Sequence, residues 1–113
     1  MLSKQFRHDT KSLAAFFHAK SYFVKGSVVS LKIRKNRNNT TRWAFLVSSS
    51  IKKNATTRNL TKRRMREAAK KLIPIVKKGL DIVFLLKLYS KRAPSFTTLE
   101  DDMIQTLKQW GAL

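Results

Sequence analysis

The segment with the clearest capacity for chemistry is TTRNLTKRRMREAAKKL, residues 56–72, in which seven side chains are Lys or Arg and one is Glu. On a helix that turns 100° per residue, four of the cations fall on one arc: Lys62, Arg63, Arg66 and Lys70. Arg58 and Asn59 are expected at the N-terminal end of this helix, where free backbone N–H groups also favour an anion. A helix face that is merely solvated usually mixes both signs at spacings of three or four residues. A cationic arc with one carboxylate nearby instead indicates phosphate binding.

The charge of the whole chain supports a polyanionic partner. Its 113 residues include 25 Lys or Arg against six Asp or Glu, for a net charge of +19. Such a charge costs stability through self-repulsion, which a bound polyanion relieves. Nucleic acid is the first candidate and an anionic membrane surface the second. The helix alone leaves helix-turn-helix DNA binding, RNA binding and a solvated basic face open.

Composition also bears on compartment and membrane association. The longest apolar run, residues 82–86, is far too short to span a bilayer. The N-terminal residues lack the pattern of a secretory signal. The chain has no cysteine, which excludes disulfides and cysteine-ligated metal sites. These features predict a cytoplasmic protein that does not enter membranes.

The residues for acid–base catalysis are sparse. Apart from Asp9, which adjoins His8, neither His8 nor His18 has an acid near it in the sequence, and the three glycines form no phosphate-cradling loop. The cluster Glu100–Asp102 is expected in the first turn of a helix, where the helix dipole favours negative charge. We therefore expect no catalysis by this chain itself.

Periodicity predicts the elements that position the basic segment. The expected order is a helix at 12–19, a strand from 27 to 34, a strand at 42–47 covered on both faces, a helix from about 57 to Pro74, a strand at 81–88 and a helix at 97–110, with an optional short strand at 22–25. Val29, Leu31 and Ile33 are expected on one face of their strand. This order indicates an α+β or α/β sandwich, in which helices pack on one sheet, as a single domain over residues 1–113 with a loose basic arm at 1–11.

Finer signals mark the ends and faces of these elements. Met65, Ala69 and Leu72 are expected to face the core, and Pro74 should end their helix. Gly79 suits a left-handed bend. Thr97 and Glu100 have the spacing of a capping box. In the last helix, the predicted buried side carries Met103, Leu107 and Trp110.

The stretch RNLTKRRMRE, residues 58–67, resembles the R-N-x-x-K-R-x-x-R-E signature of the bacterial ribonuclease P protein family. Six positions match: Arg58, Asn59, Lys62, Arg63, Arg66 and Glu67. Leu60 stands where that family often has a further basic residue. The resemblance extends to FLVS at 45–48, DIVFLLK at 81–87 and the C-terminal helix, so it covers nearly the whole chain in order.

The resemblance implies a helix–three strands–helix–strand–helix fold, as in the second domain of a small-subunit ribosomal protein, with a left-handed crossover between parallel strands. It also implies the protein subunit of a ribonucleoprotein that removes the 5′ leader of precursor tRNA. The RNA subunit would perform the chemistry with Mg²⁺ that the RNA mainly holds. The protein would be a monomer in a 1:1 complex and would broaden the range of substrates.

The resemblance further implies two sets of contact residues. Contacts to the catalytic RNA would come from Arg58, Asn59, Lys62, Arg63, Arg66 and Lys70. A cleft for the precursor tRNA leader would include Leu13, Phe17, Leu31, Lys52, Lys53 and Lys87. The leucines stand where the family has aromatic rings, and Phe17 either stacks on a leader base or packs in the core.

A second function class remains beside this one. A ribosomal or RNA-chaperone protein with a purely structural role would have the same size, charge and lack of cysteine. Only the signature and its flanking segments separate the two, and they favour the ribonuclease P subunit.

Overall fold

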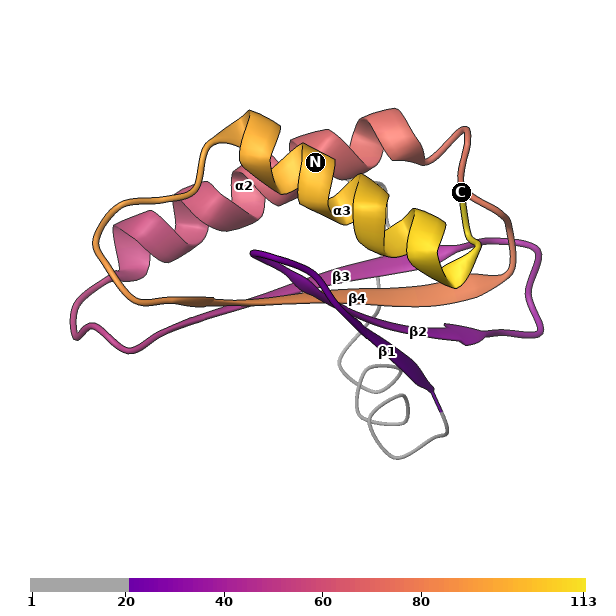
Figure 1. The fold of residues 1–113 in the computed structure, drawn as a ribbon, viewed down its shortest axis with the longest axis horizontal. Helices are drawn as coiled ribbons and strands as arrows, with labels where there is room; N and C mark the ends of the chain where they lie inside the picture. The colour runs from indigo at the N-terminus through magenta and orange to yellow at the C-terminus, as the bar shows by residue number, and fades with distance from the viewer. Residues whose placement is uncertain (1–20) are drawn as a thin grey trace.

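The computed structural model describes residues 21–113. Its elements are β1 (Tyr22–Lys25), β2 (Ser30–Lys35), β3 (Arg42–Ser49), α2 (Ala55–Leu72), β4 (Leu80–Leu88) and α3 (Phe96–Trp110). Figure 1 shows two layers, with α2 and α3 side by side over one face of a four-stranded sheet. The predicted α+β class is therefore correct, and the short strand at 22–25 is present.

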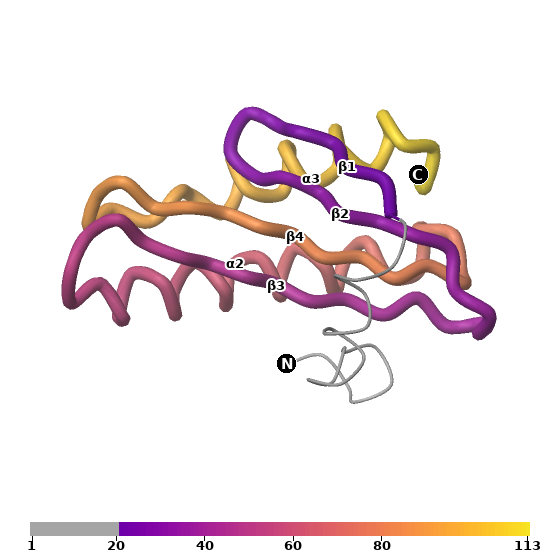
Figure 2. Tube along the Cα trace, turned by 90° about the horizontal axis from the view of Figure 1, so that it is seen from below, coloured from indigo at the N-terminus to yellow at the C-terminus, as the bar shows by residue number. Residues whose placement is uncertain are grey.

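The sheet is mixed, with the strand order β1-β2-β4-β3. β2 pairs antiparallel with both of its neighbours, whereas β3 and β4 are parallel and joined through α2. In Figure 2, which views the sheet with the helices behind it, β3 and β4 run in the same direction and α2 crosses at the back. This connection is left-handed, as the resemblance implied and against the usual right-handed preference.

Alternation along the strands sorts side chains between the two faces. Val29, Leu31 and Ile33 are buried toward the helices, as their period of two predicts. β3 also alternates: Trp43, Phe45 and Val47 are buried, and the residues between them are half-buried. The prediction that β3 is covered on both faces is therefore wrong.

Helix α2 is amphipathic, with polar side chains on one side and apolar side chains recurring at helical spacing on the other. Its buried residues are Thr61, Met65, Ala68, Ala69 and Leu72, which include the predicted stripe. The helix ends at Leu72, two residues before Pro74, as expected from the ring of proline. It begins at Ala55, two residues earlier than predicted. Gly79 adopts the expected left-handed conformation, with φ of 79°.

The start of α3 differs from the prediction. Ser95, not Thr97, is the N-cap residue, and its hydroxyl accepts a hydrogen bond from the Thr98 amide. No acid lies in the first turn of this helix. The predicted capping box and the assignment of Glu100–Asp102 to the helix start are both wrong, because the helix begins one residue earlier at Phe96.

The predicted first helix at 12–19 and the basic arm at 1–11 lie outside the described residues. The prediction of a single domain over the whole chain remains a prediction. Within residues 21–113, strands and helices share one core cluster.

Candidate nucleic-acid interface

The predicted phosphate-binding residues all project from α2. Arg58, Asn59, Arg63 and Lys70 are exposed, whereas Lys62 and Arg66 are half-buried beside the core-facing stripe. We call the cations Arg58, Lys62, Arg63 and Arg66 the α2 ridge. The amide of Arg58 donates to the carbonyl of Asn54 at 3.0 Å, so the free amides of the helix start precede this residue. The sequence-based expectation that Arg58 itself lies at these amides is therefore not met.

Both ends of the ridge are fixed by contacts of neighbouring residues. Asn54, which is buried, donates from its side chain to Ser49 Oγ at 2.8 Å and to the Ser90 carbonyl at 3.0 Å. It thereby ties the start of α2 to the ends of β3 and β4. Arg64 faces away from the ridge and donates to the Pro94 carbonyl at 2.8 Å. Arg64 therefore stabilises the fold, whereas the ridge cations beside it remain available to bind a partner.

The carboxylates near α2 pair with lysines outside the ridge. Glu67 contacts Lys70 at 3.2 Å, and Glu100 contacts Lys71 at 3.5 Å. Lys71 also lies over the ring of Phe96, 5.0 Å from its centroid. Among residues 21–113, no carboxylate pairs with any of the four ridge cations. Lys70, although predicted as an RNA contact, shares its charge with Glu67.

The face of the sheet opposite the helices carries a groove of about 680 Å³. Its lining includes side chains from all four strands and α2: Phe23, Lys25, Ser30, Leu46, Ser48, Lys62, Leu85, Lys87 and Tyr89. We call it the sheet groove. Lys62 belongs to both the α2 ridge and this groove, so the two surfaces are continuous at that residue. The groove thus combines cations with exposed aromatic rings, a pairing suited to unstacked bases and phosphates.

The predicted leader-cleft residues are distributed unevenly around the sheet groove. Lys87 lines it, with its ammonium group 5.6 Å from the centroid of the Tyr89 ring. Lys52 and Lys53 are exposed in the loop between β3 and α2 and do not line it. Leu31 has no exposed surface, because it points to the helix side of the sheet. Its assignment to an open cleft is therefore wrong.

Leu13 and Phe17 lie outside the described residues, so their predicted roles remain predictions. Sequence reasoning missed Phe23 and Tyr89, which are 62% and 73% exposed. Phe23 pairs in register with Lys32, on the open face. The signal for Phe23 was the alternation of Tyr22–Lys25, whose buried third residue places Phe23 and Lys25 on the opposite face.

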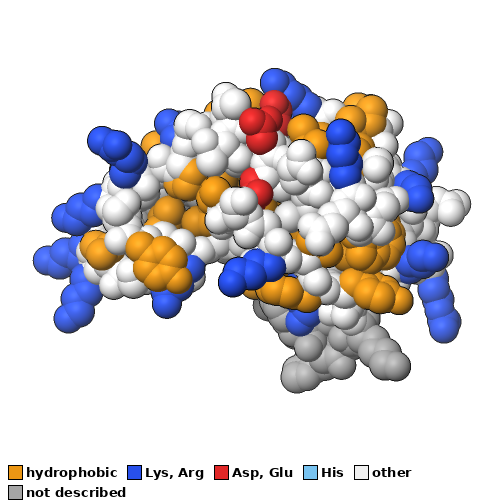
Figure 3. All heavy atoms as spheres, viewed as in Figure 1, with side chains coloured by type: hydrophobic (Ala, Val, Ile, Leu, Met, Phe, Trp, Pro, Cys, Tyr) orange, Lys and Arg blue, Asp and Glu red, His pale blue; other side chains and the backbone are white. Residues whose placement is uncertain are grey.

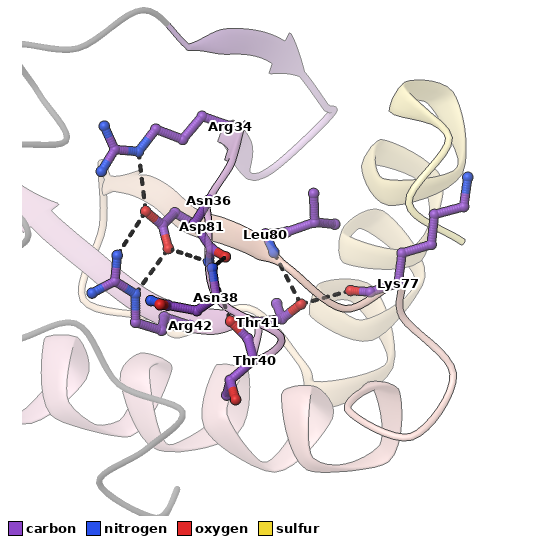
Figure 4. A network of polar contacts seen from close by, with 9 residues as sticks. All are labelled: Arg34, Asn36, Asn38, Thr40, Thr41, Arg42, Lys77, Leu80 and Asp81. Carbon is purple, nitrogen blue, oxygen red and sulfur yellow. Dashed lines mark hydrogen bonds and ion pairs between the residues drawn. The ribbon is translucent and has the colours of Figure 1, made fainter.

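The other end of the open sheet face holds a buried carboxylate, Asp81 (Figure 4). Arg42 binds it through two nitrogens at 2.9 Å, and Arg34 Nε lies at 3.0 Å. Asn36 donates to it at 2.8 Å. Burial alone would raise the pKa of Asp81, but the hydrogen bonds from Arg42, Asn36 and Arg34 outweigh it and hold the pKa below its usual value.

Within residues 21–113, no three His, Cys, Asp or Glu side chains come together as a metal site would need. Neither helix of this range has the length and apolar character for crossing a membrane.

The fold is that of a small α+β protein, a mixed sheet covered on one face by two helices. Its cationic ridge beside an open aromatic groove is the type of surface that binds nucleic acid. The sequence model of the family described as ribonuclease P matches residues 4–111. The chain therefore belongs to the ribonuclease P protein family. Proteins of this family are subunits of a tRNA-processing ribonucleoprotein, in which their partner is the ribonuclease P RNA.

Curated relatives agree with the family match. The ribonuclease P protein component of a Pseudanabaena species is 35% identical over 104 residues, which cover 91% of this chain and 89% of the relative. That of Chloroflexus aurantiacus is 35% identical over 79 residues, covering 70% of this chain and 58% of the relative.

Solved structures confirm the fold. The ribonuclease P protein of Staphylococcus aureus, solved as a mutant with defective mRNA degradation activity, has a TM-score of 0.79 at 19% identity and covers 97% of this chain and 92% of its own. The Thermotoga maritima protein has a TM-score of 0.71 at 23% identity, covering 91% of this chain and 96% of its own.

Proposed function

We propose that this protein binds the catalytic RNA of ribonuclease P through the α2 ridge and holds the 5′ leader of precursor tRNA in the sheet groove. The observation that carries the proposal is the set of four ridge cations that pair with no carboxylate of residues 21–113, on a helix anchored at its start. The phosphates of a folded RNA would be the anionic partners that the ridge lacks among residues 21–113.

The sheet groove supports the assignment to the leader. A leader is single-stranded, so its bases are free to stack on rings such as Phe23 and Tyr89 while Lys25 and Lys87 contact phosphates. Lys62 joins ridge and groove, which would place the leader next to the catalytic RNA. The protein would thereby strengthen substrate binding and broaden the range of precursors.

Mg²⁺ would be held mainly by the RNA, and cleavage would take place there, with the protein acting as a binding subunit. The protein would be a monomer in a 1:1 ribonucleoprotein located in the cytoplasm. A purely structural RNA-chaperone role would predict binding to many RNAs without any effect on leader removal.

Reconstitution tests these statements. The protein is mixed with a ribonuclease P RNA at a low Mg²⁺ concentration, at which the RNA alone is slow, and release of the 5′ leader is measured. We expect the wild-type protein to restore cleavage and the Arg58→Ala/Lys62→Ala/Arg66→Ala variant to do so only at much higher protein concentration. A wild-type protein that binds this RNA but leaves cleavage unchanged would favour the RNA-chaperone role.

A further inference from the structure

A second group of cations lies at the end of the molecule opposite the start of α2. We define the end patch as Tyr22, Lys35, Arg37, Lys77, Lys78 and Trp110, which together line one open groove of about 1230 Å³. Figure 3 shows Lys and Arg gathered at both ends of the molecule, with the acidic side chains between them. The end patch is thus separated from the α2 ridge along the long dimension of the protein.

The four cations of the end patch have no carboxylate partner among residues 21–113. Lys35, Arg37, Lys77 and Lys78 are all exposed. No Asp or Glu of residues 21–113 lines this groove, and none of the four cations forms an ion pair within that range. Like charges that line one groove repel one another, so an anionic occupant would stabilise the arrangement.

The four cations come from two segments, residues 35–37 and the connector between α2 and β4, and hydrogen bonds hold these segments together. The amide of Asn36 donates to the Gly79 carbonyl at 2.8 Å. The side-chain oxygen of Asn36 accepts from the Asn38 amide at 2.8 Å (Figure 4). A Cβ at Gly79 would lie 3.0 Å from the Asn38 carbonyl oxygen, so the backbones approach closely. The loop that carries Arg37 is therefore fixed beside Lys78.

The connector between α2 and β4 is fixed from its other side as well. The Thr41 hydroxyl donates to the Lys77 carbonyl at 2.6 Å, and the Lys77 amide donates to the Ala112 carbonyl at 3.0 Å. Its cations accordingly need little backbone ordering when an anion binds, which favours affinity.

Aromatic rings complete the end patch and indicate which anion it takes. Tyr22 is 64% exposed, and its ring lies 5.9 Å from that of Trp110 at a tilt of 59°. Trp110, expected in the core, is only half-buried. A phosphate or a duplex backbone would use the cations alone. Exposed rings beside cations suit unstacked bases joined by phosphates.

We propose that the end patch is a third RNA-binding site, beside the α2 ridge and the sheet groove, which takes a single-stranded RNA segment by stacking a base on Tyr22 and Trp110 and contacting phosphates through the four cations. This inference rests on the proposed RNA-binding function and adds a separate contact to it. Helix α2 has 18 residues and is about 27 Å long. The two surfaces would therefore hold different RNA segments and bridge them.

Tryptophan fluorescence of the full chain tests the proposal, with a short oligouridylate as the probe. Trp43 is 1% exposed, so Trp110 is the tryptophan that a stacked base can quench. We expect quenching in the wild type, a loss of affinity of roughly tenfold or more in Arg37→Ala/Lys77→Ala/Lys78→Ala, and quenching at near wild-type affinity in the matched variant Arg58→Ala/Lys62→Ala/Arg66→Ala. Tyr22→Leu, a change at an exposed side chain, should also weaken the quenching.

The proposal is overturned if the oligouridylate does not quench, or if only the α2 variant loses affinity. Binding of the ribonuclease P RNA is measured for the same variants. If the α2 variant loses that binding while the end-patch variant quenches like the wild type, only the assignment of RNA to the end patch is wrong. Full affinity of the α2 variant for the ribonuclease P RNA would instead contradict the proposed function.

Discussion

The carboxylate of Asp102, on α3, accepts a hydrogen bond of 2.7 Å from the amide of Val29, which lies just before β2. The same carboxylate accepts from the amides of Ser27 and Val28 at 3.0 and 2.8 Å. A Cβ at Gly26 would lie only 2.5 Å from Asp102 Oδ2, so this turn needs glycine for its close approach to α3. One side chain thus satisfies three backbone donors and docks the β1–β2 turn onto the last helix.

Asp102→Ala should lower the free energy of unfolding by roughly 2–4 kcal/mol, because it leaves three amides without their charged acceptor. Urea titration measures the change. Asp101→Ala, at the exposed neighbouring position, serves as the control and should change stability by no more than about 0.5 kcal/mol. Equal effects of the two substitutions would show that the three hydrogen bonds contribute little.

The Asp81 network predicts a specific dependence of stability on acid. Because the folded-state pKa of Asp81 is lowered, its stabilising contribution is complete above the pKa of an unfolded carboxyl group, about 4, and is lost as the pH falls through the folded-state value. The stability advantage of the wild type over Asp81→Asn should therefore be constant near neutral pH and shrink below about pH 4. Unfolding free energies of both proteins across this range provide the measurement. An advantage that stays constant in acid would rule out the network as its source.

The α2 ridge should determine the salt dependence of RNA binding. Each phosphate contact that is removed lowers the slope of log affinity against log salt by about one unit, so Arg58→Ala/Lys62→Ala/Arg66→Ala should lose roughly two to three units. Lys71→Ala neutralises a cation of the same helix that faces Glu100, and it should leave the slope almost unchanged. Titrations of ribonuclease P RNA at several salt concentrations compare the variants. A wild-type slope in the triple variant would exclude the ridge as the main contact surface.

The sheet groove should distinguish substrates that carry a leader from those that do not. Lys87→Ala should weaken binding of precursor tRNA by several fold and leave mature tRNA binding nearly unchanged, because only the precursor has a leader to occupy the groove. Lys108→Ala, at an exposed position on α3, is the matched control. Affinities are measured with the reconstituted ribonucleoprotein. Equal weakening for both tRNAs would place the leader elsewhere.

Local patterns in the sequence were sufficient for much of the fold. The alternation of Val29, Leu31 and Ile33 marked β2, and the helical spacing of Met65, Ala69 and Leu72 gave the buried side of α2. These features depend on neighbours within a few residues, which periodicity captures. The resemblance added the α2 contact residues, none of which is tested by the fold alone.

Features that depend on distant partners could not be predicted. Asp102 lies 73 residues from Val29 in the sequence, so its role as an amide acceptor was not visible, and a place in the helix start was assigned to it instead. The resemblance assigned Leu31 to a cleft position, but its place in the strand turns it to the core. The sheet groove is formed by side chains from four strands, whose order follows from long-range pairing.

The hand of the β3–α2–β4 connection decides which side of the sheet is accessible. With the same strand order and directions, a right-handed connection would carry α2 to the opposite face, leaving α3 alone on its side. Phe23 and Lys87 would then lie beneath a helix, and the sheet would become the middle of three layers. An uncommon topological choice thus keeps one whole side of this small domain uncovered by α2, and gathers the cations of that helix at its border.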